Sequence, residues 1–143
     1  MSYKILLVDD DPDILEIIGY NLKKEGYEIF TAEDGFIAIE QAKKHQPNLI
    51  ILDVMMPNMN GIEACTKIRE IPELSKTIIT FLTARSEDYS QIAGLEAGAD
   101  DYLTKPVKPK ILLSKVKSLL RRLEGGKEAS VILFKGIEID SKK

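Results

Sequence analysis

The chain alternates short, wholly apolar runs with longer runs whose apolar residues recur at helical spacing, and this alternation most constrains the fold. The short runs predict strands at residues 5–8, 27–31, 49–52, 78–82 and 102–103, and the longer runs predict helices at residues 12–25, 34–46, 62–69, 86–97 and 109–122. Strands that are apolar throughout are typical of a sheet covered on both faces. The pattern therefore predicts an α/β fold with a five-stranded parallel sheet and helices on both faces.

Two helix starts carry recognisable capping residues. Asp11 is a predicted N-cap with Pro12 at the first helical position, and Gly26 is predicted to end that helix. Asp34 is predicted to start the second helix, which stops before Pro47.

Composition narrows the class of protein. A chain of 143 residues with a formal charge of −3 suits one domain and does not favour direct binding of nucleic acid, which takes clustered Lys and Arg. The longest apolar runs are about six residues, whereas a membrane-spanning helix needs roughly 20, so no membrane association is expected. No leader pattern follows Met1, and the single cysteine, Cys65, indicates a reducing compartment, so we expect a cytoplasmic protein. Cys65 is predicted to be a packed helix residue, because the one histidine, His45, lies in a polar helix end and offers no general base.

The composition changes near residue 123. Residues 124–130 are rich in glycine and charge and predict a linker, and residues 131–143 contain two short strand-like pieces. We therefore expect one domain over residues 1–123, a linker over residues 124–130, and the start of a truncated C-terminal domain over residues 131–143.

Carboxylates follow two of the predicted strands. Asp9 and Asp10 come directly after the first strand and Asp53 directly after the third. In isolation, the acidic run has an ordinary explanation in helix capping, which is all we expect of Asp11. If the two strands are neighbours, the three other carboxylates converge, and like charges packed together require a compensating cation. Mg²⁺, a hard ion with oxygen ligands, is the predicted compensator.

Two further strand ends carry polar residues suited to the same site. Lys105 follows the fifth strand and would bring an ammonium to the carboxylates, although it could equally be a surface lysine before a turn. Thr83 follows the fourth strand and could bond an oxyanion, although a threonine is also an ordinary strand residue. With Mg²⁺ bound, the charges of three carboxylates, the ion and Lys105 would balance.

These residues lie in motifs that closely resemble the receiver domains of two-component response regulators. The motifs are Val8-Asp9-Asp10-Asp11-Pro12, Leu52-Asp53-Val54-Met55-Met56-Pro57 with Asn60-Gly61, Leu82-Thr83-Ala84, and Gly98-Ala99-Asp100-Asp101-Tyr102-Leu103-Thr104-Lys105-Pro106. The resemblance covers residues 4 to 122 or so. It implies a flavodoxin-like, doubly wound sheet with strand order 2-1-3-4-5.

The resemblance also implies a role for each matching residue. Asp53 would be the phosphoacceptor, phosphorylated from a phosphohistidine of a sensor histidine kinase. Mg²⁺ would be bound directly by Asp10 and Asp53, through water by Asp9, and by the backbone carbonyl of Met55. Thr83, the backbone of Ala84, and Lys105 would hold the phosphoryl oxygens, with Pro106 following a cis peptide bond. Thr83 and Tyr102 would form the switch, although Tyr102 could be an ordinary half-buried aromatic.

The motif set looks most like the OmpR/PhoB branch of winged-helix transcription factors. This implies a homodimer formed on phosphorylation through helix 86–97, strand 102–103 and helix 109–122, with DNA bound only by the missing C-terminal domain. Asp100, Asp101, Lys115 and Arg122 would form ion pairs across the dimer, unless they are simply a solvated charged surface. Gln91 and Ile111 stand where the branch usually has a Lys or Arg and a Glu, so one interfacial pair is missing. Ile78, where a proline is usual, and Thr80, within an apolar strand, are lesser departures.

Two other functions are compatible with parts of the pattern. A stand-alone or adaptor receiver would act by binding protein, and the sequence beyond residue 143 would distinguish it from a transcription factor. A metal-dependent phosphohydrolase is disfavoured because no pocket-forming insertion or second acid–base group is present.

Overall fold

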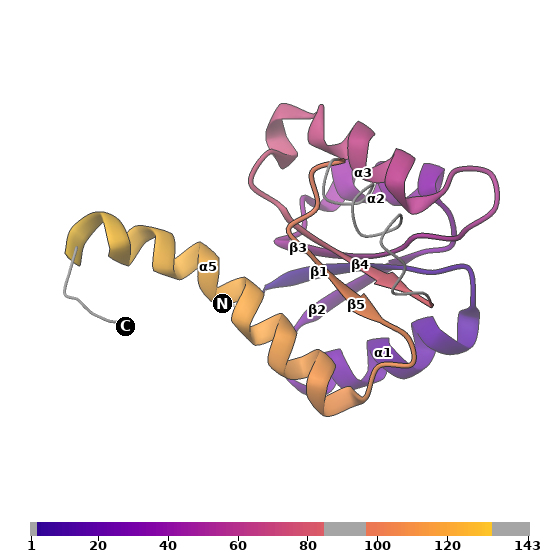
Figure 1. Cartoon of the computed structure of the whole chain (residues 1–143), viewed down its shortest axis with the longest axis horizontal. Helices are drawn as coiled ribbons and strands as arrows, with labels where there is room; N and C mark the ends of the chain where they lie inside the picture. Colours follow the sequence, from indigo (N-terminus) through magenta and orange to yellow (C-terminus); the bar gives the residue numbers. More distant parts are fainter. Residues whose placement is uncertain (1–2, 85–96, 133–143) are drawn as a thin grey trace. The chain divides into compact units, whose positions relative to one another are not determined.

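The structure, a computed structural model, describes residues 3–84 and 97–132 of the chain. Its parallel sheet has the strand order β2-β1-β3-β4-β5 (Figure 1). The strands are β1 (Lys4–Val8), β2 (Glu28–Ala32), β3 (Leu49–Asp53), β4 (Ile78–Thr83) and β5 (Asp101–Thr104). The flavodoxin-like fold and its strand order are therefore as predicted.

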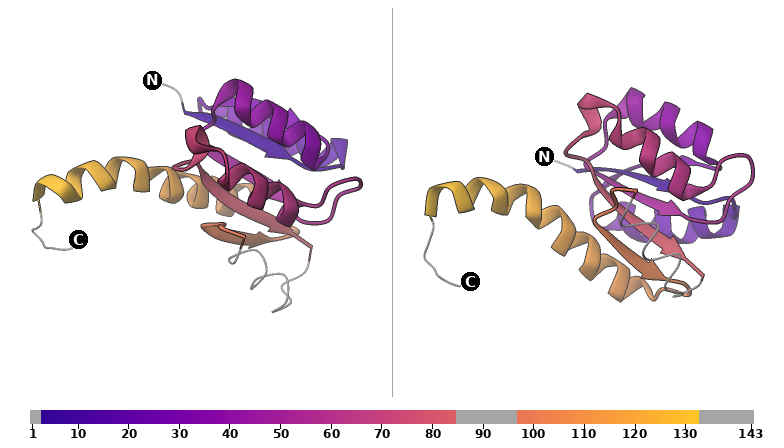
Figure 2. Two further views of the ribbon diagram at one scale, coloured as in Figure 1. Left: turned by 90° about the horizontal axis from the view of Figure 1, so that it is seen from above. Right: turned by 45° about the horizontal axis from the view of Figure 1, so that its top comes forward.

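Helices cover both faces of this sheet. Those in the same unit as the sheet are α1 (Pro12–Lys24), α2 (Gly35–His45), α3 (Gly61–Arg69) and the short 3₁₀ helix η1 (Pro72–Leu74). The chain also contains the helix α5 (Pro109–Ile132). α1 lies on one face of the sheet, and α2 and α3 lie side by side on the other (Figures 1 and 2). The helix predicted at residues 86–97 falls, apart from its last residue, outside the described part of the chain.

The predicted capping residues act as expected. The side chain of Asp11 accepts a hydrogen bond from the amide of Asp13, with Pro12 at the first position of α1, and Asp34 accepts one from the amide of Ile37 at the start of α2. Four strands run slightly longer than the apolar pattern indicated, and β2 is shifted by one residue. Asp53 and Thr83 are consequently the last residues of β3 and β4, not the first residues after them.

The main core lies between the sheet and helices α2 and α3. It combines alternate residues of β1, β3 and β4, such as Leu52 and Phe81, with Ala38 of α2 and with Cys65 and Ile68 of α3. Burial raises the pKa of the Cys65 thiol to about 11, although Arg69 lowers it somewhat. The prediction that Cys65 is a packed, unreactive helix residue is supported by this burial.

The helix α5 differs from the expectation for the C-terminal part of the chain. It continues through residues 124–130, for which composition predicted a linker, and includes Val131 and Ile132 of the first predicted strand piece. Each glycine at 125 and 126 costs a helix about 1 kcal/mol, but extending a formed helix adds a hydrogen bond per residue and the neighbouring Lys127, Glu128 and Ala129 favour it. Residues 133–143 lie outside the described part, so the start of a second domain stays a prediction.

Residues 110–132 belong to a second compact unit of the chain. Within the described residues, no helix has the length and apolarity needed to cross a membrane.

Candidate functional site

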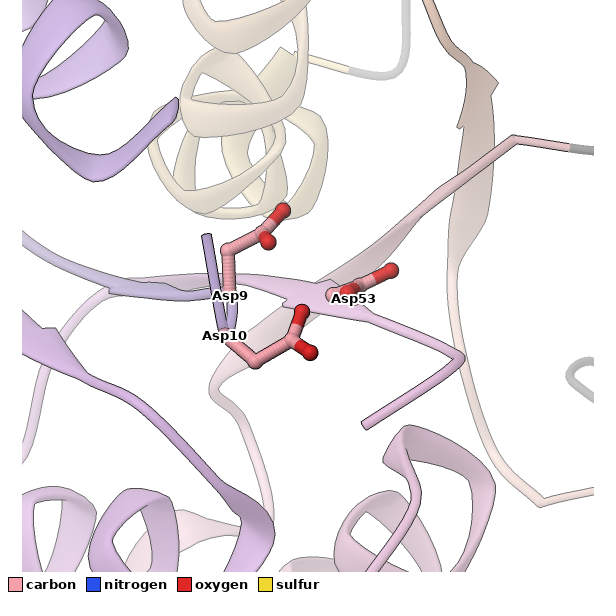
Figure 3. A group of neighbouring side chains, drawn as sticks. All are labelled: Asp9, Asp10 and Asp53. Carbon is pink, nitrogen blue, oxygen red and sulfur yellow. The ribbon is translucent and has the colours of Figure 1, made fainter. Parts of the chain in front are cut away.

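Three carboxylates meet at the carboxyl edge of the sheet. β1 and β3 are parallel neighbours, with Val8 paired to Leu52, so the residues that follow Val8 lie beside the end of β3. Carboxylate oxygens of Asp9, Asp10 and Asp53 lie within 4.8 Å of one another (Figure 3). Asp9 and Asp53 are buried and Asp10 is exposed, so the cluster opens to solvent on one side.

Local hydrogen bonds fix the acidic turn after β1. The amide of Asp9 donates to the carbonyl of Ala32 at 3.1 Å, which extends the pairing of β1 with β2 by one residue. One carboxylate oxygen of Asp9, Oδ1, accepts from the amide of Asp11 at 2.9 Å. Asp9 is thereby held at the sheet edge, while Asp11 caps α1 and takes no part in the cluster.

The loop that follows Asp53 is closed by Gly61. The Gly61 amide donates to the carbonyl of Val54 at 2.9 Å, and a Cβ added to Gly61 would lie only 2.1 Å from the carbonyl oxygen of Asp53. Asn60 caps α3 in a reciprocal pair of hydrogen bonds with Glu63. The helix start thus touches the backbone of the central aspartate, and only glycine fits there.

Lys105 brings positive charge to the cluster. It directly follows β5, and its Nζ lies 2.8 Å from Asp9 Oδ2 and 3.5 Å from Asp53 Oδ1. Burial opposes the charged form of Lys105, but the hydrogen bond to Asp9 and the charge of Asp53 outweigh it and raise the pKa of the ammonium. The Lys105 amide also donates to the carbonyl of Thr83 at 2.6 Å, and the Lys105–Pro106 peptide bond is cis.

The electrostatics of Asp53 indicate a shortage of positive charge. The pKa of Asp53 is raised to about 6. Burial is the largest cause, and the charges of Asp9 and Asp10 also raise the pKa, whereas the charge of Lys105 and the hydrogen bond from the Met55 amide lower it. Three ionised carboxylates beside one ammonium leave a deficit of two charges, which a divalent cation would remove. The residues therefore fit a divalent cation.

The donor set favours Mg²⁺. All candidate ligand atoms are oxygens, which hard cations prefer. Two oxygens bound to one Mg²⁺ lie at most about 4.2 Å apart, so a cluster spread over as much as 4.8 Å suits a site that water completes. Met55, the predicted carbonyl ligand, follows two residues after Asp53 and has an exposed side chain.

The predicted switch residues share one face of the sheet. Thr83 ends β4 and is buried, Ala84 follows it, and Tyr102 of β5 is half-buried against the core. Tyr102 pairs with Phe81 and Thr104 with Thr83 across the two strands. Side chains two residues apart on a strand lie on the same face, so Thr83 and Tyr102 are diagonal neighbours.

The four residues predicted for a dimer face all lie in the described part of the chain. Asp100 is engaged within the chain, where its carboxylate bonds Arg69 at 2.8 Å and the Ile79 amide at 2.9 Å. Asp101 accepts from the Tyr102 amide. Lys115 and Arg122 lie on α5, in the second unit.

Arg69 was predicted only as the last residue of a helix, with no functional role. A basic residue in the last turn of a helix commonly interacts with the helix dipole. The sequence around Arg69 therefore gave no sign of a further role. Its partners are the backbone carbonyls of nearby residues such as Thr77, and Gly98 and Asp100, which are remote in sequence.

Comparison with known proteins decides the family. A model of the response regulator receiver domain matches residues 5–117. The chain belongs to this family. It is thus a signalling domain of a two-component system and not an enzyme in the usual sense.

Individual relatives point to one branch. The chain is 44% identical over 124 residues to the alkaline phosphatase synthesis transcriptional regulatory protein PhoP of Bacillus subtilis, covering 87% of this chain and 51% of PhoP, so it spans about half the length of that relative. The crystal structure of DrrB, an OmpR/PhoB homologue of Thermotoga maritima, has 38% identity and a TM-score of 0.72, covering 88% of this chain and 54% of DrrB. The predicted likeness to the OmpR/PhoB branch is confirmed.

A third relative bears on the metal. The receiver domain of the sensor histidine kinase PA1611 from Pseudomonas aeruginosa has 29% identity and a TM-score of 0.79, covering 85% of this chain and 99% of that domain. Its crystal structure contains a magnesium ion coordinated in the active-site cleft.

Proposed function

We propose that Asp53 accepts a phosphoryl group, in a Mg²⁺-dependent reaction, from a phosphohistidine of a sensor histidine kinase. The observation that carries this proposal is the position of Asp53 Oδ1, 3.5 Å from Lys105 Nζ and within the cluster formed with Asp9 and Asp10. A nucleophile, a cation site and an ammonium thus meet at one sheet edge, which are the parts that phosphoryl transfer requires.

The transfer needs no general base. A carboxylate oxygen of Asp53 attacks the phosphorus, the bond from phosphorus to the histidine nitrogen breaks, and the electron pair stays on that nitrogen. With a pKa of about 6, Asp53 is already mostly ionised at neutral pH, and a bound cation favours the ionised form further. The products are an aspartyl phosphate on this chain and a histidine on the kinase, which becomes neutral as its ring takes up one proton from solvent.

Each neighbouring residue has a distinct task. Asp10 and Asp53 would hold Mg²⁺ directly, Asp9 through water, and Met55 through its backbone carbonyl. When bound, Mg²⁺ supplies positive charge that offsets the charge on the transferring oxygens. Lys105 binds a phosphoryl oxygen through its ammonium, and the Thr83 hydroxyl and the Ala84 amide bind the others. In our proposal these donors align the group with Asp53 and stabilise the charge that develops on it.

Phosphorylation would then change the shape of the β4–β5 face. A phosphoryl group replaces one negative charge by about two. Its oxygens draw Thr83 inward, and the ring of Tyr102 moves into the space that Thr83 leaves. Their position as diagonal neighbours on one sheet face supports this coupling. The altered face would bind a second copy of the chain.

The output proposed for the whole protein is control of transcription. It is supported by the likeness to PhoP, a transcriptional regulatory protein. DNA would be bound only by a C-terminal domain that residues 131–143 begin. A stand-alone receiver that acts by protein binding is the alternative, and the sequence beyond residue 143 distinguishes the two.

Intact-mass measurement after incubation with acetyl phosphate tests the central proposal. We expect one added phosphoryl group with Mg²⁺, and none with EDTA or in Asp53→Asn. Asp13→Asn, which alters an exposed aspartate of α1, is the matched control and should be phosphorylated normally. A phosphoryl group that still attaches to Asp53→Asn would overturn the assignment. Turnover of an external phosphoester by Asp53→Asn would favour a phosphohydrolase.

A further inference from the structure

Lys105 depends on a short strand for its position. β5 has four residues, lies at the edge of the sheet, and hydrogen-bonds within the sheet to β4 alone. Lys105 comes directly after it. A slip of one residue in the pairing of β5 with β4 would turn every side chain of β5 to the opposite face, and Lys105 would lose Asp9 and Asp53. The register of β5 therefore needs to be held by something besides its few ladder bonds.

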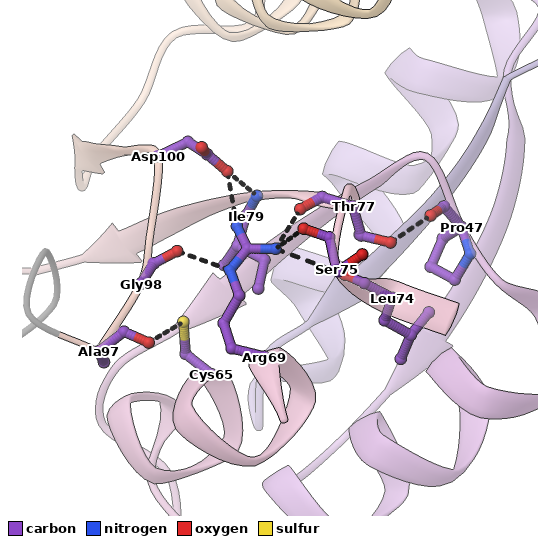
Figure 4. A network of polar contacts seen from close by, with 10 residues as sticks. All are labelled: Pro47, Cys65, Arg69, Leu74, Ser75, Thr77, Ile79, Ala97, Gly98 and Asp100. Carbon is purple, nitrogen blue, oxygen red and sulfur yellow. Dashed lines mark hydrogen bonds and ion pairs between the residues drawn. The ribbon is translucent and has the colours of Figure 1, made fainter. Parts of the chain in front are cut away.

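Arg69, at the end of α3, binds residues that lie just before β4 and residues that lie just before β5 (Figure 4). Its Nε donates to the carbonyl of Gly98 at 2.7 Å, its Nη1 to the carbonyl of Thr77 at 2.6 Å, and its Nη2 to the carboxylate of Asp100 at 2.8 Å. One guanidinium thus connects α3 to the residue before β4 and to the segment that enters β5. Charge-assisted bonds of this length are the strong ones.

Asp100 completes the connection. The same oxygen that binds Arg69, Oδ2, accepts from the amide of Ile79 at 2.9 Å, and the amide of Asp100 donates to the carbonyl of Ile79 at 2.8 Å. Asp100 is the residue immediately before β5, so these bonds set which residue of β5 faces which residue of β4.

Gly98 lets the chain pass close to Arg69. Its φ of +103° is in the region that favours glycine, and a Cβ there would lie 2.8 Å from Arg69 Cγ. Backbone and arginine are therefore fitted to each other at this point. At the other end of β5, the Lys105 amide donates to the carbonyl of Thr83. Both ends of β5 are tied to β4, the first through Arg69 and Asp100.

We propose that Arg69 and Asp100 are positioning residues for phosphoryl transfer, which hold β5 in register and so place Lys105 against Asp9 and Asp53. The inference rests on the proposed function. Asp100 lies five residues before Lys105, about 16 Å along an extended chain, so the pair acts through the strand and not by contact with the site.

The location of the cation ligands gives a sharp test. Asp9, Asp10 and Asp53 lie on or after β1 and β3, so loss of Arg69 should spare Mg²⁺ binding. For Arg69→Gln we expect the rate constant of phosphorylation by acetyl phosphate to fall about tenfold, while the dissociation constant for Mg²⁺ stays within about twofold of wild type. In hydrogen exchange, the amides of β5 should exchange faster and those of β1 and β3 unchanged.

Further variants separate positioning from general destabilisation. Lys67→Gln removes an exposed cation from the same helix and should leave all three measurements unchanged. Arg69→Lys keeps the charge but loses the planar fork, and should slow the reaction by an intermediate factor. On a Lys105→Gln background, Arg69→Gln should cause no further loss of rate, because its effect passes through Lys105.

An Arg69→Gln protein that is phosphorylated at the wild-type rate, or one that loses Mg²⁺ affinity in equal measure, would overturn the inference. So would a further tenfold loss on the Lys105→Gln background. A wild-type protein that takes up no phosphoryl group overturns the proposed function and the inference together. A phosphorylated wild type with an unaffected Arg69→Gln overturns the inference alone.

Discussion

Burial and the charge of Asp9 raise the pKa of Asp53 to about 6, from an ordinary value of 3.8, and this shift has a consequence for stability. Above pH 6 or so the carboxylate is ionised in both folded and unfolded states, and the folded state bears the full cost of the buried charge. As the pH falls through about 6 the folded protein binds the proton first, so stability rises until the unfolded chain is protonated too, near pH 4. The ionised carboxylate of Asp53, which we propose to be the phosphoacceptor, therefore lowers the stability of the metal-free protein at neutral pH.

Asp53→Asn should stabilise the metal-free protein at pH 7.5, because the amide carries no charge. The rise of the pKa from 3.8 to about 6 corresponds to a gain in the free energy of unfolding of at most roughly 3 kcal/mol. Urea unfolding in EDTA measures the difference, which should shrink at pH 4.5, where the wild-type carboxyl is largely protonated. Saturating Mg²⁺ should stabilise the wild type more than the variant. A variant that is no more stable than wild type at pH 7.5 would contradict this account.

Thr80 provides a second prediction about a single side chain. It is fully buried on β4, and among the described residues its hydroxyl has no hydrogen-bond partner. Thr80→Val keeps the shape and removes the unpaired hydroxyl, so we expect stabilisation of about 1–2 kcal/mol in urea unfolding.

The control is Thr77→Val, at a buried threonine just before β4. The Thr77 hydroxyl donates to the carbonyl of Pro47 at 3.1 Å, so its loss should destabilise the protein by about 1 kcal/mol. If Thr80→Val destabilises the protein as Thr77→Val does, the hydroxyl of Thr80 has a partner and the prediction is wrong.

At the scale of whole elements, the start of α3 is pressed against the end of β3. Gly61→Ala would place a methyl group 2.1 Å from the carbonyl oxygen of Asp53, so the helix start or the aspartate must move. We expect destabilisation of about 2 kcal/mol or more, and at least a tenfold loss of Mg²⁺ affinity, because the loop that holds Met55, whose carbonyl we propose as a ligand, is displaced. Thermal unfolding and Mg²⁺ titration measure the two effects.

Gly19→Ala is the matched control. Gly19 lies within α1, and a Cβ there would meet nothing closer than Ile29 at 4.0 Å. Alanine is the better helix former, so this variant should gain about 0.5–1 kcal/mol and bind Mg²⁺ normally. Equal effects of the two substitutions would mean that the contact of Gly61 with Asp53 is unimportant.

The elements also show what the sequence could and could not predict. Apolar runs located all five strands, and the rule that parallel strands end at one edge brought Asp9 and Asp53 together before any coordinates were known. Arg69 escaped notice because its partners are mostly backbone carbonyls, which carry no sequence signal. The helical conformation of residues 124–130 was missed because two glycines outweighed their helix-forming neighbours in the composition.

At the scale of the whole molecule, the open question is how phosphorylation becomes assembly. The phosphorylated protein should shift from monomer toward dimer, and light scattering over a range of concentrations with and without acetyl phosphate measures the shift. The carboxylate of Asp100 is already bonded to Arg69 and to the amide of Ile79 within the chain. A phosphorylated protein that stays monomeric at every concentration would contradict a dimeric output.

Gln91 and Ile111 allow this interface to be tested by restoring charge. The resemblance implies that they stand where the branch usually has a Lys or Arg and a Glu, and Ile111 is 55% exposed. Gln91→Lys with Ile111→Glu should tighten the phosphorylated dimer, since two symmetry-related pairs, at up to about 1 kcal/mol each, correspond to at most roughly 30-fold in affinity. Ile111→Glu alone should weaken it, because an unpaired carboxylate replaces an apolar contact. The gain of the double variant should shrink in 0.5 M salt, where charges are screened. A gain that salt leaves unchanged, or equal affinities for the single and double variants, would show that the two copies meet through another surface.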